Sequence, residues 1–181
     1  MRNLTESSFV SLDGVADDPR AWAMSYFDEQ AQQIAREALQ ASDGMLMGRG
    51  TYEYLASMAE QSGPYADAIN DIRKYVFSAT LEQAGWNNST IVREDAVAAV
   101  RELKQQEGRD LIVYGHGRLT QTLLEHGLID EIRFAIHSVL RGSGQTPSTA
   151  THPHQLELLE ATPLASGVVA LTYRTGQRRP E

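Results

Sequence analysis

Short apolar runs without polar alternation recur along the first two thirds of the chain. They are Met45–Met47, Tyr75–Ser78, Thr90–Val92 and Leu111–Tyr114. Such runs are typical of strands that are buried on both faces, as in a parallel sheet covered by helices. Apolar residues at helical spacing precede or follow the runs, at about 26–41, 52–59, 65–73, 97–103 and 119–124. The pattern therefore predicts strands that alternate with helices, after a first strand over residues 2–12 that ends at the turn Asp13-Gly14.

The pattern changes in the last third of the chain. Residues 130–139 alternate between apolar and other side chains, which predicts a half-buried strand with His137 on its outward face. Residues 155–160 and 168–175 are two further strands, which we expect to form an antiparallel hairpin. The whole chain thus predicts an α/β fold with a mixed, mainly parallel central sheet, flanking helices and an antiparallel C-terminal edge.

Composition narrows the classes of protein that this fold can represent. The chain has 181 residues, 41% of them hydrophobic, and no linker divides it, so we expect a single domain over residues 1–181. A formal net charge of -8 argues against general binding to nucleic acid or to an anionic membrane. No apolar run approaches membrane-spanning length. The chain has no cysteine, which excludes disulfides and thiolate metal sites and predicts a cytoplasmic protein.

Two junctions between a strand and a helix carry candidate chemistry. Gly48-Arg49-Gly50-Thr51 and Gly115-His116-Gly117 each follow a predicted strand and open a predicted helix. Free backbone N–H groups and the positive end of the helix dipole favour an anion there, and glycine lets a phosphate approach the backbone closely. Arg49 adds a planar fork of donors that suits phosphate oxygens. Two ordinary tight turns, one beside an exposed arginine, are the alternative interpretation.

Five motifs in a fixed order resemble a known family. They are Ser11-Leu12-Asp13-Gly14, Met47-Gly48-Arg49-Gly50-Thr51-Tyr52-Glu53, Lys74-Tyr75-Val76-Phe77-Ser78, Tyr114-Gly115-His116-Gly117-Arg118-Leu119 and Gly127-Leu128-Ile129-Asp130-Glu131. The chain resembles the dihydrofolate-reductase-like superfamily, from about residue 2 to 175. Within it, the chain is similar to stand-alone relatives of the riboflavin-biosynthesis reductase domain, which is the C-terminal half of bifunctional deaminase–reductases. The resemblance implies the three-layer dihydrofolate-reductase-like fold.

The resemblance also implies a cofactor and the residues that bind it. Members of the family transfer hydride from NADPH to a pterin-like or aminopyrimidine substrate. The cofactor pyrophosphate would lie on one loop and helix start, formed by Gly115, His116, Gly117, Arg118 and Leu119. The second helix start would be formed by Gly48, Arg49 and Thr51, with Arg49 near the adenosine 2′-phosphate and Ser78 beside the adenine ribose.

On the substrate side, the resemblance places Asp13 at the edge between nicotinamide and substrate. We expect Asp13 to orient an aminopyrimidine ring or to relay a proton; the alternative is a turn residue that bonds its own backbone. Trp22 and Tyr26 either form a wall beside a flat substrate ring or belong to the edge of the core. Relatives are commonly homodimers, and the strand over 132–139 with the closing hairpin offers an apolar interface.

Three features depart from the family pattern. His116 stands where a small residue is common, so its side chain either crowds the pyrophosphate or adds a bond to it. Ala79 replaces a residue that is often arginine, which removes one expected contact with the 2′-phosphate. Residues 138–145 lack the usual proline and phenylalanine around the Gly-x-Gly turn. The zinc-binding deaminase partner is missing as well, because the chain has no cysteine.

The sequence leaves two classes of function. The first is an NADPH-dependent reductase, which the two phosphate loops and Asp13 favour. The second is a non-catalytic homodimeric module that binds a nucleotide or heterocycle, which His116 and the altered residues 142–144 favour. No metal site is expected, because His152-Pro153-His154 lacks a nearby carboxylate pair and is typical of a solvent loop.

Overall fold

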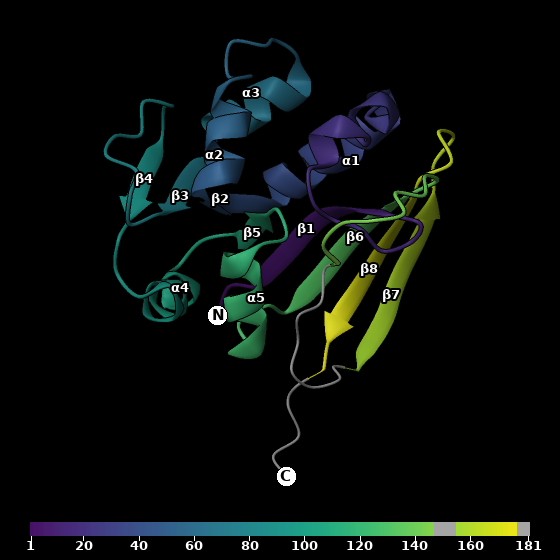
Figure 1. The fold of residues 1–181 in the computed structure, drawn as a ribbon. Coiled ribbons are helices and arrows are strands. Elements are labelled where there is room, and N and C mark those ends of the chain that lie inside the picture. The colour runs from purple at the N-terminus through teal and green to yellow at the C-terminus, as the bar shows by residue number, and fades with distance from the viewer. Residues whose placement is uncertain (147–154, 177–181) are drawn as a thin grey trace.

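The computed structural model describes residues 1–146 and 155–176, which form one mixed sheet with helices on both faces (Figure 1). The sheet has eight strands in the order β4-β3-β2-β5-β1-β6-β8-β7. The strands β4, β3, β2, β5, β1 and β6 are all parallel to one another. The strand β8 runs antiparallel to both β6 and β7. The predicted fold class is therefore confirmed. The strand bounds are β1 Leu4–Ser11, β2 Ser42–Gly48, β3 Arg73–Phe77, β4 Ser89–Val92, β5 Asp110–Tyr114, β6 Glu131–His137, β7 Leu156–Pro163 and β8 Val169–Thr175.

The helices lie in two layers. Figure 1 shows α1, α2 and α3 on one side of the sheet and α4 and α5 on the other. Two short 3-10 turns, η1 and η2, lead from β1 into α1. The bounds are η1 Pro19–Ala21, η2 Met24–Tyr26, α1 Glu29–Ala41, α2 Arg49–Ala56, α3 Pro64–Asp71, α4 Ala96–Gln105 and α5 Arg118–Glu125.

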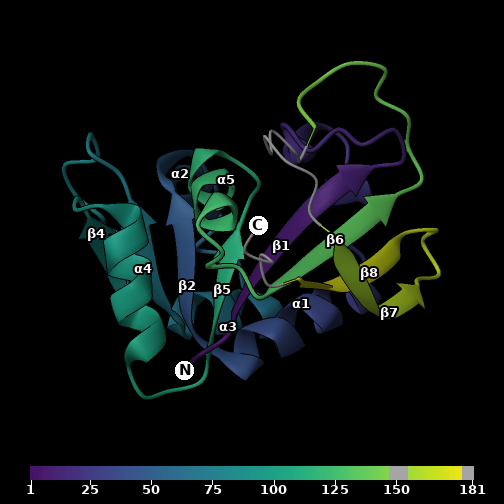
Figure 2. The ribbon, with the colours of Figure 1, turned by 90° about the horizontal axis from the view of Figure 1, so that it is seen from below.

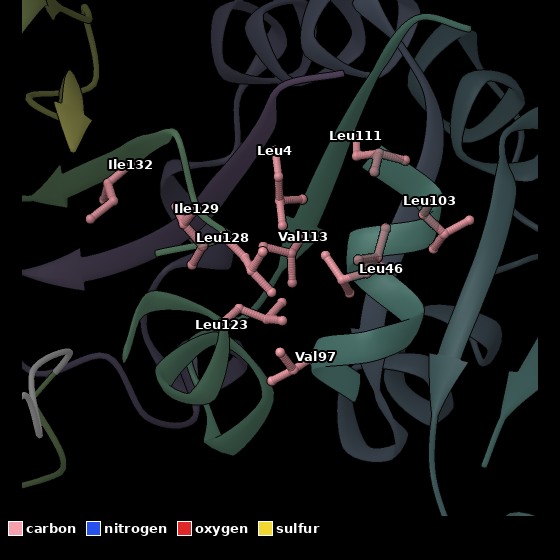
Figure 3. Packing of buried hydrophobic residues seen from close by; sticks show 11 residues of the cluster. Leu4, Leu46, Val97, Leu103, Leu111, Val113, Leu123, Leu128, Ile129 and Ile132 are labelled. Atoms are coloured by element: carbon pink, nitrogen blue, oxygen red, sulfur yellow. The ribbon is translucent and has the colours of Figure 1, made fainter. Parts of the chain in front are cut away.

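Each face of the sheet has its own hydrophobic cluster because successive strand residues point to opposite sides. Leu46 of β2 packs with Val97 of α4 and Leu123 of α5, in the cluster that Figure 3 shows. Its neighbours Met45 and Met47 belong to the cluster beneath α1, α2 and α3. The central strands are thus covered on both sides, as their unbroken apolar runs predict.

The start of α1 and the start of β2 differ from the positions that the sequence predicts. The α1 helix begins at Glu29 rather than near Tyr26, because the Asp28 carboxylate caps it and accepts a hydrogen bond from Ala31 N at 2.9 Å. The β2 strand begins at Ser42, directly after α1 and three residues before the apolar run Met45–Met47.

The expected orientation of His137 is wrong. The residue is 3% exposed, and the centroid of its ring lies 5.1 to 5.4 Å from those of Phe9, Trp22 and Tyr26. Burial lowers its pKa, and its Nδ1 lies 2.8 Å from the carbonyl oxygen of Ala135. The strand pattern could not show this, because the cover comes from the η1–η2 segment, more than a hundred residues earlier in the chain. Trp22 and Tyr26 consequently pack onto the core edge.

Candidate functional site

A cavity of about 550 Å³ lies where α2 and α5 begin. The two helices lie on opposite faces of the sheet (Figure 1), and Figure 2 shows both toward the edge to which β1 and β6 point. Both glycine junctions line this cavity, so the two anion sites expected from the sequence form one site. The lining residues are Gly48, Arg49, Gly50, Thr51, Phe77, Ala96, Tyr114, Gly115, His116, Gly117, Arg118, Leu119, Thr120 and Thr122.

The order of the strands brings the two junctions together. β2 and β5 are parallel neighbours, with Leu46 paired to Val113, so the turns that follow them lie at the same edge. The approach is close at Gly115, where a Cβ atom would lie 2.7 Å from Oγ1 of Thr51. Gly115 also has a φ of 85°, which disfavours any other residue. Thr120 fixes the turn by donating its hydroxyl to the carbonyl oxygen of Gly115 at 2.7 Å.

Both helices begin without a side-chain cap. Gly48 and Gly117 are the N-cap residues, and neither end has a side chain that accepts from the first turn. The first hydrogen bond within α5 is donated by Gln121 N to the carbonyl oxygen of Gly117. Within residues 1–146 and 155–176, the backbone N–H groups of His116 and Gly117 have no acceptor. An anion in the cavity would therefore meet unpaired donors from two helices.

Two arginines add positive charge to the cavity of an otherwise acidic chain. Arg49 is half exposed; its Nε donates to Oε1 of Glu53 at 2.6 Å and its Nη1 to Oγ1 of Thr80 at 3.0 Å. Arg118 is exposed at the start of α5 and forms no ion pair with a described residue. Burial raises the pKa of Tyr114 well above its ordinary value, so this lining residue stays neutral. The electrostatics of the cavity favour a ligand with phosphate groups.

Ser78 lies outside the residues that line the cavity. Its hydroxyl accepts hydrogen bonds from Thr80 N at 3.2 Å and Leu81 N at 3.0 Å, so it closes the turn after β3. The preceding residue, Phe77, lines the cavity instead. A contact between Ser78 and a ribose stays a prediction.

The side chain of His116 turns inward. Its Nδ1 lies 2.6 Å from Oε1 of Glu6, and the exposed fractions of the two side chains are 4% and 0%. The imidazole therefore does not crowd the cavity. The sequence analysis did not identify Glu6. The signal that could have found it is a carboxylate at an inward position of a central strand, between the inward residues Leu4 and Ser8.

Asp13 also lies outside the cavity, and it joins two loops. Its carboxylate accepts hydrogen bonds from Oγ of Ser11 at 2.6 Å, from Arg141 N at 3.0 Å and from Gly142 N at 2.7 Å. These bonds, the one from Ser11 first, lower the pKa of Asp13 to about 2. A carboxyl group with that pKa is ionised at neutral pH and has no proton to give. The carboxylate also reaches well beyond its own turn, so the simple turn interpretation is incomplete.

The two loops joined by Asp13 pair along their backbones as well. Leu12 N donates to the carbonyl oxygen of Val139 at 2.9 Å, and Ala16 N donates to that of Gln145 at 2.8 Å. These loops follow β1 and β6, which are parallel neighbours. They therefore form one connected rim at the same edge of the sheet as the cavity.

We expect Asp13→Asn to loosen this rim without changing the cavity. The amide keeps the size of the side chain but loses the charge that its three donors stabilise. The affinity of a nucleotide for the cavity should stay within about twofold, while any turnover at the rim should fall about tenfold, because a positioning defect acts mainly on the reacting geometry. Steady-state kinetics and a cofactor titration measure the two effects. A change in the shape of the pH–rate profile would contradict the assignment, because Asp13 is already ionised across the accessible pH range.

Metal-ligating clusters and membrane-spanning helices are both absent from the described residues. No group of side chains that could hold a metal ion occurs in this part of the chain, and His152 and His154 lie outside it. None of the helices in residues 1–146 and 155–176 is long and apolar enough to cross a membrane.

The model of the RibD C-terminal domain family matches residues 2–170 of the chain. The chain belongs to this family. The resemblance inferred from the five motifs is therefore confirmed.

One curated relative is similar to part of the chain. The "uncharacterized protein YyaP" of Bacillus subtilis is 30% identical over 106 residues, which are 58% of this chain and 56% of YyaP. The chain thus matches little more than half the length of that relative.

Solved structures show the same fold at low identity. A diaminohydroxyphosphoribosylaminopyrimidine deaminase/5-amino-6-(5-phosphoribosylamino)uracil reductase from Thermotoga maritima superposes with a TM-score of 0.68 and 14% identity, over 97% of this chain and 57% of that one. Dihydrofolate reductase from Schistosoma mansoni gives a TM-score of 0.66 and 14% identity, over 97% and 99% of the two chains. The dihydrofolate-reductase-like fold is thereby established.

Proposed function

We propose that this RibD-type domain is an NADPH-dependent reductase that transfers hydride to a pterin-like or aminopyrimidine compound. The observation that carries the proposal is the cavity that two uncapped helix N-termini share, with Arg49 and Arg118 among its lining residues. A diphosphate fits this arrangement because it brings two adjacent anionic groups to donors from both helices.

The cofactor contacts follow from the arrangement of the cavity. The loop and helix start from Gly115 to Leu119 would bind the diphosphate together with the helix start at Gly48, Arg49 and Thr51. Arg49 would face the 2′-phosphate, held in place by Glu53 and Thr80. Ser78 would approach the adenine ribose from the adjacent turn. Bound NADPH would supply the hydride, so the chain contributes binding, orientation and exclusion of water.

The substrate would lie against the rim that Asp13 organises. A carboxylate that stays ionised accepts hydrogen bonds from the amino and ring N–H groups of an aminopyrimidine or pterin. The structurally similar Thermotoga protein is named as a reductase of an aminouracil, which supports this substrate class. Because Asp13 does not carry a proton at neutral pH, the proton for the reduced nitrogen would come from water.

The proposal is tested by titrating the purified protein with NADPH and, separately, NADH while following nucleotide fluorescence. Tighter binding of NADPH is expected, followed by oxidation of the bound cofactor when dihydropterins or aminopyrimidines are added. Absence of binding by either nucleotide would refute the reductase function. Tight NADPH binding without turnover of any heterocycle would favour the non-catalytic binding module instead.

We also propose that the protein acts as a cytoplasmic homodimer joined through β7. This edge strand leaves Leu156, Leu158 and Leu159 exposed at 39%, 52% and 38%, although leucines on an edge strand normally need cover. Light scattering should give twice the mass of the chain, and Leu158→Glu should give the monomer. Leu140→Glu, at an exposed leucine outside the hairpin, is the control that keeps the dimer. A monomeric unmodified protein would refute this interface.

A further inference from the structure

A buried acid–histidine pair lies beneath the cavity. Nδ1 of His116 contacts Oε1 of Glu6, and Oγ of Ser8 donates to the same oxygen at 3.2 Å. Glu6 is at the centre of the sheet, where it pairs with Val113 of β5 and Ile132 of β6. Its side chain has no exposed surface.

Packing alone does not explain an ionisable pair at this position. Leu4, Val113 and Ile132 around Glu6 all belong to the hydrophobic cluster under α4 and α5, which an apolar side chain would simply extend. Removing a carboxylate from water is costly, and well-packed apolar residues often stabilise a fold as much as a buried ion pair does. A role in the adjoining cavity is therefore the better explanation.

Each member of the pair has one buried polar atom without a hydrogen-bond partner. In the described residues, the buried side-chain polar atoms without a partner are Oε2 of Glu6, Nε2 of His116, Oδ1 of Asp17 and Oγ of Ser166. Of these four residues, only His116 lines the cavity. Buried polar groups are nearly always paired, so the free Nε2 indicates a partner that arrives with a ligand.

We propose that Glu6 and His116 form an anion-binding dyad, in which Glu6 orients the imidazole and Nε2–H of His116 donates to a diphosphate oxygen. This rests on the proposed binding of NADPH in the cavity. Glu6 is then a positioning residue, like the carboxylates that orient histidine ligands from behind. Nε2 of His116 is buried, so a ligand would reach it only after a rotation of the main chain, for which the flanking Gly115 and Gly117 have the conformational freedom.

The dyad is tested with two nucleotides that differ in their 5′-diphosphate. NADP⁺ contains this group and adenosine 2′-monophosphate does not. His116→Ser should weaken NADP⁺ about tenfold or more, because a charge-assisted hydrogen bond is lost. Binding of adenosine 2′-monophosphate should change less than about twofold, since the dyad acts on the diphosphate alone. Glu6→Gln should act in the same direction, and Glu125→Gln, at an exposed position of α5, should leave both affinities unchanged.

A double variant separates recognition from folding. Glu6→Leu combined with His116→Ser removes the buried charge together with its partner, so the protein should fold even where a single variant does not. This double variant should still lose NADP⁺ affinity selectively. Recovery of full NADP⁺ affinity by the double variant would overturn the proposal.

Direct evidence comes from the ¹⁵N resonances of histidine-labelled protein. The Nε2 signal that His116→Ser removes should shift when NADP⁺ saturates the unmodified protein. An unchanged signal at saturation, or a His116→Ser variant that binds NADP⁺ normally, would refute the dyad but leave the cofactor site intact. Failure of the unmodified protein to bind NADP⁺ at all would instead refute the proposed function, and the dyad with it.

Discussion

Gly115→Ala is expected to weaken nucleotide binding strongly while the protein still folds. The new Cβ atom would meet Oγ1 of Thr51 at 2.7 Å and would force an L-residue into a φ of 85°. The two costs together should lower the free energy of unfolding by about 2–4 kcal/mol. They also push the starts of α2 and α5 apart, and a displacement of about 1 Å in a binding site can cost about a hundredfold. A fluorescence titration with NADPH and a denaturant unfolding curve measure the two effects.

Gly117→Ala is the matched control for folding stability. Gly117 is two residues further on in the same loop and has extended backbone angles, and a Cβ atom added there would meet no other atom within 4 Å. The free energy of unfolding of this variant should therefore change by less than about 0.5 kcal/mol. Equal NADPH affinity in Gly115→Ala and the unmodified protein would show that the cofactor does not bind between these helix starts.

Arg49→Ala is expected to reduce the preference of the protein for NADPH over NADH. The guanidinium can reach a 2′-phosphate that only NADPH has, so NADPH affinity should fall by about ten- to a hundredfold. NADH affinity should fall by less than about twofold, because its diphosphate keeps the backbone donors of both helices. The effect should shrink at high salt, since Arg49 is half exposed and its charge is screened.

Parallel titrations of the two nucleotides at low and high salt measure this preference. Arg20→Ala removes another exposed arginine, paired with Asp18, from a different surface and should leave both affinities unchanged. An equal loss of NADPH and NADH would place Arg49 on the diphosphate instead of the 2′-phosphate.

Local features of the sequence were sufficient to predict the elements of the fold and the two ligand-ready junctions. Unbroken apolar runs identified β2, β3 and β5 because these strands are covered on both faces. The glycine junctions at Gly48 and Gly115 were recognisable because strand, turn and helix start are contiguous in the chain.

Tertiary structure alone decided which residues act together. The pairing of β2 with β5 merges two separate junctions into one cavity. His116 meets Glu6 across 110 residues, and Asp13 meets Arg141 across 128. Local periodicity carries no information about such contacts, because they depend on strand order and register. The sequence by itself therefore determined the family, the elements and the two glycine turns that line the cavity, whereas the buried Glu6–His116 pair and the rim organised by Asp13 arise only when distant strands become neighbours.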